Sequence, residues 1–229
     1  MTTQSNPNVT VNIVSALTTV ANQPQKVLFV GQKLAGGTST AGELIENIQN
    51  DNSWDTLFGA DSQLAAMIRS ARLLNQKTQF DAISLDDHGS AVKATGTIAI
   101  TGPSTEAGSF TVALGSQQNN KVTIAVASGD SATAIGDTIV TAITAALNMP
   151  VTAVNVTGTV TFTAENGGTY GNTLGMEVVG EVAGIGFTLV AMGGVIAGSV
   201  DPVLTTVFDV VGDTRYQGVV WPWADSGDQ

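Results

Sequence analysis

The chain has 229 residues, of which 43% are hydrophobic, so it is long enough to fold around a core of its own. The formal net charge is −11, and no Lys or Arg occurs between Lys121 and Arg215, which argues against sequence-independent binding to nucleic acid phosphates. The absence of cysteine excludes disulfides, thiolate metal sites and cysteine nucleophiles, and no apolar run approaches the roughly 20 residues that span a membrane.

Charge is sparse along the chain. Only 12% of the residues are charged, against about 25% in an average soluble domain, and 26 residues are glycine. A surface rich in Thr, Ser, Asn and Ala suits a protein that lies partly against neighbouring protein. The same composition fits a Thr-rich β domain with no special partner, so composition alone leaves both interpretations open. The N-terminus lacks the basic and apolar pattern of a secretory signal, which predicts folding in the cytoplasm.

The first 25 residues form a polar N-terminal arm that contains Pro7 and Pro24. The alternation of Val9, Val11 and Ile13 predicts one strand within the arm. Such a segment is either a frayed terminus or an edge strand that adds to another subunit.

An α/β pattern follows the arm. Residues 26–30 are predicted to form a buried strand, and the glycine-bearing loop 31–38 after it is placed like a phosphate-binding loop. Gly37 stands where the lysine of such a loop must reach the phosphates, so we expect no nucleotide there. Thr40 and Glu43 have the spacing of a capping box and predict a helix. The apolar residues of that helix are Leu44, Ile45 and Ile48.

Residues 53–78 are typical of an aromatic entry followed by one amphipathic helix that lies against a sheet. Asp61 or Ser62 is expected to cap its first amides. Its expected apolar face consists of Leu64, Met67, Ile68, Ala71 and Leu74. Three cations gather at the far end, where the helix dipole favours positive charge. They are Arg69, Arg72 and Lys77.

A second strand is predicted at 79–85, and the order strand, helix, helix, strand implies an α/β layer with crossover connections. Asp86, Asp87 and His88 follow at the carboxyl end of that strand, where α/β proteins place ligand sites. These side chains could bind a metal or exchange protons, but adjacent carboxylates on extended chain point opposite ways. We therefore favour a polar turn and assign no catalytic, cofactor-binding or metal-binding residue.

Short runs of Thr, Val, Ile and Ala, separated by Gly, Asn and Ser, predict a β-rich domain packed on one helix from residue 95 to 195. The predicted strands are 97–100, 109–114, 121–127, 152–156, 159–164 and 174–179. The helix covers 131–147 with Asp130 as its cap. Its apolar face holds Ile135, Ile139, Ile143 and Ala146. Hydrophilic turns at 117–120 and 166–168 have the composition of exposed hairpin ends.

The chain then returns to the first layer. Residues 193–200 are typical of a linker, Asp201 and Pro202 of the start of a helix, and Gly212 of its end. One face of that helix carries Val203, Val207 and Val210. A final strand within 217–223 is expected to rejoin the sheet begun at residue 26, before a polar tail at 224–229.

The predicted fold is therefore α+β or α/β. We expect a small α/β layer formed by residues 26–94 plus 196–229, with an inserted β-rich domain packed on one helix over 95–195. The arm 1–25 precedes both.

Five stretches together resemble the tail sheath proteins of contractile-tailed bacteriophages, of the transposable-phage type, over nearly the whole chain. The most specific is Phe58-Gly59-Ala60-Asp61-Ser62-Gln63-Leu64-Ala65-Ala66-Met67. The others are Gly96-Thr97-Ile98 with Gly102, residues 132–148 leading to Pro150-Val151-Thr152-Ala153, Gly167-Gly168-Thr169-Tyr170-Gly171-Asn172, and Asp201-Pro202 with the closing Val219-Val220-Trp221-Pro222-Trp223-Ala224-Asp225. Their common order, rather than any single stretch, carries the resemblance.

The resemblance implies a structural subunit of a helical sheath that surrounds the tail tube and contracts to drive the tube through the host envelope. Such a protein is located in the virion after assembly in the host cytoplasm. Its implied partners are other sheath subunits, joined by exchanged terminal arms, and the tail tube protein. No catalysis, cofactor, nucleic acid or membrane insertion belongs to that role, and a phage-tail-like bacteriocin would fit equally.

In the family the inserted domain decorates the outside of the sheath, while a carboxyl-terminal domain carries the tube contacts. That domain has no counterpart in this sequence. We therefore expect an amino-terminal portion of a sheath subunit, either a fragment or a natural truncation, which by itself is a soluble monomer.

Two other classes of protein stay open. A β-rich surface module that recognises a glycan or receptor would use Tyr170 and Asn172 in the turn 169–172, although Gly and Asn there also suit positive-φ turns. An α/β enzyme would act through the Asp86-Asp87-His88 turn, but the chain has no nucleophile motif and a single histidine. We therefore predict a protein that is not an enzyme.

Overall fold

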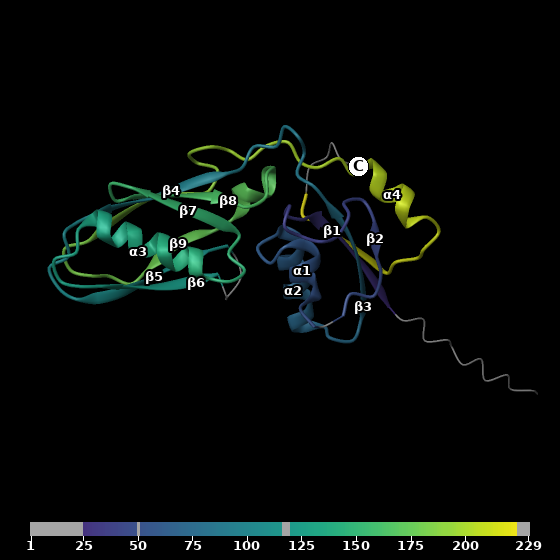
Figure 1. Cartoon of the computed structure of the whole chain (residues 1–229), viewed down its shortest axis with the longest axis horizontal. Coiled ribbons are helices and arrows are strands. Elements are labelled where there is room, and N and C mark those ends of the chain that lie inside the picture. Colours follow the sequence, from purple (N-terminus) through teal and green to yellow (C-terminus); the bar gives the residue numbers. More distant parts are fainter. Residues whose placement is uncertain (1–24, 50, 116–119, 224–229) are drawn as a thin grey trace, which may run out of the picture.

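The structure is a computed structural model that describes residues 25–49, 51–115 and 120–223. Figure 1 shows two lobes side by side along the longest axis, with two chain segments crossing between them. We call residues 25–85 and 204–223 the α/β lobe, residues 94–192 the β-rich lobe, and segments 86–93 and 193–203 the linkers. The predicted arm strand at 9–13 and the polar tail at 224–229 lie outside the described residues.

The α/β lobe is built on one four-stranded sheet in the order β11-β1-β3-β2. The middle strands are parallel, β11 extends the sheet in parallel beside β1, and β2 lies antiparallel to β3 at the other edge. The strands are β1 (Lys26–Gln32), β2 (Leu44–Ile45), β3 (Gln79–Leu85) and β11 (Gly218–Val220). The helices are α1 (Ser53–Phe58), α2 (Gln63–Leu74) and α4 (Thr205–Val211).

Both faces of this sheet are covered, which explains why β1 is a nearly continuous apolar run rather than an alternating one. Phe29 points into a core with α1 and α2, where Trp54, Phe58 and Leu64 are buried. Leu28 and its neighbour on the same face pack instead under α4 and Trp223. That second core consists of Leu28, Val30, Ile83, Leu85, Leu204, Val207 and Trp223.

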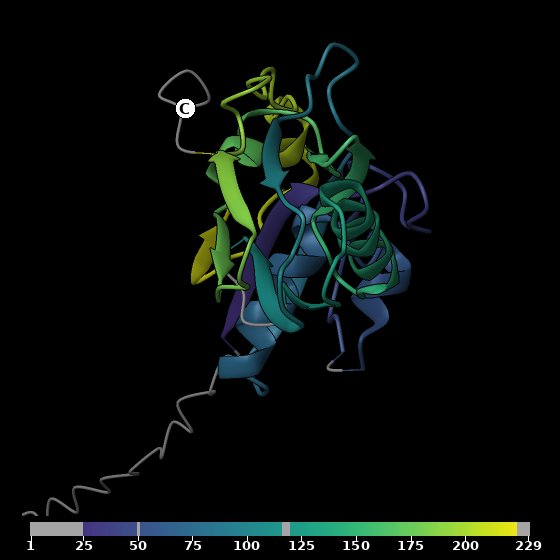
Figure 2. The same cartoon turned by 90° about the vertical axis from the view of Figure 1, so that its left-hand side faces the viewer.

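The β-rich lobe contains a four-stranded sheet in the order β10-β4-β8-β7, a three-stranded sheet in the order β6-β5-β9, and one long helix. Its elements are β4 (Thr95–Thr101), β5 (Gly108–Leu114), β6 (Lys121–Val126), α3 (Ala132–Ala145), β7 (Val151–Val156), β8 (Thr159–Ala164), the short 3₁₀ helix η1 (Thr169–Thr173), β9 (Met176–Val179) and β10 (Gly186–Val190). In Figure 2, α3 lies on the side of this lobe away from β10.

One hydrophobic core fills the β-rich lobe. Strands β6 and β8 alternate buried apolar residues with more exposed residues, most of which are threonine, as strands with one solvated face do. The residues of this core cluster all lie between Ala94 and Met192, and neither core of the α/β lobe contains any of them. We propose the domain boundaries 26–94 plus 196–229 and 95–195; the separate cores support this division, although the β-rich core already begins at Ala94.

Much of the predicted architecture is confirmed. The fold is α+β, the strand at 79–85 has the predicted bounds, and the final strand joins the sheet begun at Lys26 through a parallel pairing with β1. The six strands predicted for the β-rich lobe are present within a few residues of their expected ends. One strand, β10, was missed because its residues show no alternation of buried and exposed side chains.

The helix predicted from the Thr40 and Glu43 capping box is wrong. Leu44 and Ile45 form β2 and pair with Ile83 and Ala82 of β3. Gly42 has a φ of 82° and Asn47 a φ of 53°, so the backbone leaves the right-handed helical region on both sides of the strand. The short apolar run therefore covers the free edge of β3 instead of coiling.

The stretch 53–78 contains two helices, α1 and α2, separated by Gly59 at a φ of 85°. Ser62 caps α2 by accepting a hydrogen bond from the amide of Ala65, as predicted for one of the two candidate caps. Leu64 and Ile68 are fully buried, but Leu74 is 93% exposed because the last turn of α2 extends past the core. Placing Leu74 on the apolar face was therefore wrong.

Arg72 does more than offset a helix dipole. Its guanidinium lies 3.9 Å from the centre of the Phe80 ring and donates to the carbonyl oxygens of Ile48 and Thr78. Burial lowers the pKa of Arg72 from its ordinary value. The side chain thus satisfies carbonyl groups of two loops while its stem packs in the core.

The two predicted aspartate caps are also wrong. Ser131, not Asp130, caps α3, while Asp130 accepts from the amide of Ala127 and closes the preceding turn. Helix α4 begins only at Thr205, and Asp201 instead binds Thr169 in the β-rich lobe. In α4, Gly212 follows the last helical residue as predicted. Of the three valines predicted on its apolar side, Val207 is buried whereas Val203 and Val210 are exposed.

The contrast between Leu64 and Leu74 on one helix can be tested by alanine substitution. Leu64→Ala is expected to lower the free energy of unfolding by about 2–5 kcal/mol, because it leaves a cavity under α2. Leu74→Ala, the matched control, is expected to change it by less than about 0.5 kcal/mol. Urea unfolding followed by the fluorescence of buried Trp54 measures both. Equal effects of the two substitutions would contradict the packing of α2.

Candidate functional site: a polar socket between the lobes

The chain segment that follows β8 enters a polar socket on the α/β lobe. We define the socket as Gln32, Lys33, Gln63 and Asp87, and the inserted turn as Asn166–Gly167. Gln32 and Lys33 lie at the carboxyl end of β1, Gln63 begins α2, and Asp87 follows β3 by two residues. The parallel crossover brings these ends together at one edge of the sheet.

Asn166 is 4% exposed and uses both ends of its side-chain amide in the socket. Its Oδ1 accepts from the backbone amide of Gln63 at 2.9 Å. Its Nδ2 donates to the carbonyl oxygen of Lys33 and to Oδ1 of Asp87, both at 3.1 Å. The turn predicted here as an exposed hairpin end is therefore buried, and that prediction is wrong.

Gly167 adds two backbone hydrogen bonds. Its amide donates to Oδ2 of Asp87 and its carbonyl oxygen accepts from Nε2 of Gln32, both at 2.7 Å. A Cβ at Gly167 would lie 2.7 Å from the Cβ of Ala91, so no larger residue fits without movement. Gln32 Nε2 also donates to Asp87 at 2.7 Å, which fixes that carboxylate to the α/β lobe.

The Asp86-Asp87-His88 turn is used structurally. Asp87 points into the socket, whereas Asp86 points outward and pairs with Lys33 Nζ at 3.5 Å. His88 accepts from the amide of Ser90 through Nδ1, 3.1 Å away, as part of a local turn. The opposite directions of the two carboxylates agree with the sequence-based expectation. Within the described residues no three His, Asp or Glu side chains gather as a metal site requires.

The loop at 31–38 is occupied by its own chain. The amides of Leu34, Thr38 and Ser39 donate to carbonyl oxygens of α1 at 2.9 to 3.0 Å. A Cβ at Gly37 would lie 2.6 Å from the carbonyl oxygen of Leu57. These amides satisfy the open end of α1 and are not aimed at an anion.

Tyr170 and Asn172, the two residues on which glycan recognition would rest, are also committed to the fold. Asn172 donates to and accepts from the backbone of Gly198 at 2.9 and 2.7 Å. Tyr170 packs against the core of the β-rich lobe, and burial raises its pKa. The turn thus holds the second linker in place.

Two clefts flank the socket. One, of about 260 Å³, lies between Asp61 on the α/β lobe and the end of α3 with β7. The other, of about 520 Å³, is lined by Lys33, Asp86 and Lys93 among others, and Glu165 borders both clefts. Burial raises the pKa of Asp61 and of Glu165. The charge of Asp61 raises the pKa of Glu165 further, while Lys93 opposes the shift.

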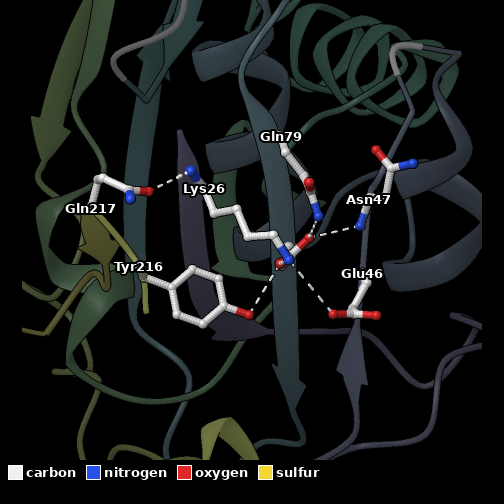
Figure 3. Close-up of polar contacts among 7 residues, drawn as sticks. Lys26, Glu46, Asn47, Gln79, Tyr216 and Gln217 are labelled. Atoms are coloured by element: carbon white, nitrogen blue, oxygen red, sulfur yellow. Dashed lines mark hydrogen bonds and ion pairs between the residues drawn. The ribbon is translucent and has the colours of Figure 1, made fainter. Parts of the chain in front are cut away.

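A second polar cluster lies at the opposite, amino-terminal end of the strands (Figure 3). Its centre is Asp81, fully buried in β3. The carboxylate accepts from the amide of Asn47 at 2.7 Å, from Gln79 Nε2 at 3.1 Å and from the hydroxyl of Tyr216 at 3.1 Å. Lys26 Nζ lies 3.9 Å from it. Asp81 thereby joins the loop after β2 to the turn before β11.

Burial and the charge of Asp81 raise the pKa of Tyr216, so its hydroxyl stays protonated and can donate. Hydrogen-bond donors surround the Asp81 carboxylate on several sides. The cluster therefore stabilises the fold and is not arranged as a reactive site.

An apolar face borders α4 and the outer strand β11. Phe208 is 59% exposed and Trp221 42% exposed, and a small groove of about 60 Å³ with only apolar lining lies between helix and sheet. The further exposed apolar side chains here are Val203, Val210, Val219 and Val220. No helix in the described part of the chain is long and apolar enough to cross a membrane.

Removal of the Tyr216 hydroxyl tests how much its hydrogen bond to Asp81 contributes to stability. Tyr216→Phe is expected to lower the free energy of unfolding by about 1–3 kcal/mol, because it removes a donor to a buried carboxylate. Tyr170→Phe, which changes a phenol against the other core, serves as the control and should cost less. Equal losses measured by chemical denaturation would show that the bond to Asp81 contributes nothing specific.

The flanking carboxyl groups predict a pH effect. Because the folded pKa of Glu165 lies above its ordinary value, the folded chain keeps this proton at pH values where the unfolded chain has lost it. The stabilising contribution is therefore present at low pH and lost as pH rises through the raised pKa. Glu165→Gln is expected to raise the melting temperature at pH 7, with the difference vanishing near pH 4 and below.

Glu181→Gln, at an exposed position of the same lobe, is the matched control for this pH effect and should leave the melting temperature unchanged. A Glu165→Gln difference that is the same at pH 4 and pH 7 would contradict the assignment.

The sequence of the chain is similar to that of a known protein. No family model matches the chain. Over 206 residues it is 31% identical to the "Mu-like prophage FluMu tail sheath protein" of Haemophilus influenzae. The alignment covers 88% of this chain and 41% of the relative, so the chain spans about two fifths of the length of the protein it matches. The resemblance to tail sheath proteins is thereby confirmed: the chain is homologous, over most of its length, to part of a phage tail sheath protein.

Proposed function

We propose that this chain is part of a structural subunit of a contractile phage tail sheath, which surrounds the tail tube and shortens to drive it through the host envelope. The single observation that carries the proposal is the 31% identity to a prophage tail sheath protein over 206 residues. At that length and identity, common ancestry and a common architecture are the simplest explanation.

The surface of the chain supports a role in an assembly. The exposed apolar side chains around α4 and β11, with Trp221 and Phe208 at their centre, form the kind of patch that marks contacts with other protein. A content of only 12% charged residues limits the desolvation penalty when many copies lie side by side. The partners in this proposal are other sheath subunits and the tail tube protein, and the location is the virion after assembly in the host cytoplasm.

The proposal is for a protein that is not an enzyme. The candidate catalytic residues Asp87 and His88 form hydrogen bonds with backbone and amide groups of the chain itself. The glycan-binding alternative likewise loses its main candidates, because Asn172 is held by the second linker. Among the described residues, no specific contact favours catalysis or glycan binding.

Labelling of tail particles tests the proposed function. Antibodies raised against the purified chain should decorate the tail of induced phage particles along its length when the particles are viewed by negative-stain electron microscopy. The pre-immune serum is the control. Decoration confined to the capsid, the baseplate or the tail fibres would overturn the proposal, and so would particles that remain unlabelled after mild disruption of the sheath.

A further inference from the structure

The two lobes have separate hydrophobic cores and meet through polar groups. The core cluster of the β-rich lobe shares no residue with the two clusters of the α/β lobe. We propose that the Asn166–Gly167 turn and the polar socket form a latch that holds the lobes in one orientation, and that opening this latch lets the lobes turn about the two linkers. This inference concerns a conformational device and does not rest on the proposed function.

The latch is compact and directional. Asn166 bonds to Gln63 and to Lys33, and Gly167 bonds to Gln32, so two adjacent residues contact both β1 and the start of α2. Asp87 sits between them, accepting from Asn166 and from Gly167 while Gln32 holds it in place. Bonds in several directions from one turn fix an orientation, which a single contact does not.

The two linkers run antiparallel beside each other, and Thr169 and Asn172 hold the second linker to the β-rich lobe, so the hinge lies where the linkers enter the α/β lobe. The amide of Val92 donates to the carbonyl of Ser199 at 2.9 Å, and the amide of Thr95 to that of Ile196 at 2.9 Å. Gly193 in the second linker has a φ of 78°. Bending there leaves both lobes intact, because Ala94, the core residue in the paired stretch, belongs to the core of the β-rich lobe and moves with that lobe.

The free energy needed to open the latch is limited, because the lobes contact each other mainly through polar groups. Hydrogen bonds of the latch can be exchanged for bonds to water, so each contributes only a fraction of its intrinsic strength. The clefts of about 260 and 520 Å³ beside the socket show that the lobes do not pack closely there. An open state thus exposes mainly polar groups, which makes the latch, rather than apolar packing, the element that selects the orientation.

Distance measurements between the lobes test the latch in the full chain. The protein has no cysteine, so Leu74→Cys and Val156→Cys, both at exposed positions, place one spin label on each lobe. The doubly labelled parent is expected to give one narrow distance distribution by pulsed electron paramagnetic resonance. Adding Asn166→Ala is expected to broaden the distribution and produce a second maximum, because three bonds of the latch are lost.

Gly167→Ala is a second, independent way to open the latch. The added methyl group must displace Ala91, and the same broadening is expected even though every side-chain partner remains. This variant decides the question should Asn166→Ala fail to fold.

Two matched controls separate the latch from general destabilisation. Asn155→Ala removes an asparagine that bonds to Thr133, Asp137 and Gly158 within the β-rich lobe alone, and Gly89→Ala adds a methyl group where nothing lies within 4 Å. Both should keep the narrow parental distribution. The proposal is overturned when folded Asn166→Ala or Gly167→Ala retains the parental distribution, or when the controls broaden it equally.

Discussion

The relation between the two halves of this protein depends on one half-buried carboxylate. Asp87 receives hydrogen bonds from Gln32, from Asn166 and from the backbone of Gly167, and so joins the end of β3, the end of β1 and the turn after β8. Its neighbours in sequence follow from this role: Asp86 must point the other way, toward Lys33, because the chain is extended there. A histidine and two acids that resemble a reactive cluster in the sequence are thereby divided among a socket, a surface ion pair and a turn.

The two lobes differ in the kind of side chain that they bury. In the α/β lobe, charged side chains are buried: Asp81 is fully buried on an inner strand of the sheet, and Arg72 lies over Phe80 while it donates to loop carbonyl groups. In the β-rich lobe the strands surround a single apolar core, and the buried polar side chains, Thr95, Ser104, Asn120 and Asn166, are uncharged. Burying a polar group is costly unless it is paired, so the α/β lobe tolerates substitution at those positions less well than at its exposed apolar ones.

Sequence periodicity predicted most elements because their packing is local to one face. Strands β6 and β8 of the β-rich lobe show this alternation clearly. Periodicity failed where a long-range contact decides the outcome. Leu44 and Ile45 have no intrinsic signal for the edge of β3, Leu74 lies beyond the reach of the core, and Asn166 has the composition of an exposed turn although its amide is buried. The socket could not be predicted, since its hydrogen bonds join residues far apart in the chain: Gln32 bonds to Gln63, 31 residues away, and to Gly167, 135 residues away.

Composition alone left open whether the low charge reflects neighbouring protein or an ordinary Thr-rich domain, and the location of the exposed side chains favours the first interpretation. Outward Val and Thr on the β-rich lobe are what a solvated strand face normally carries. Around α4 and β11, by contrast, Phe208 and Trp221 lie exposed beside an apolar groove and an edge strand without charge. Each Å² of apolar surface removed from water there contributes about 25 cal/mol. The α/β lobe, rather than the insertion, is therefore the half of the chain best suited to contact other protein.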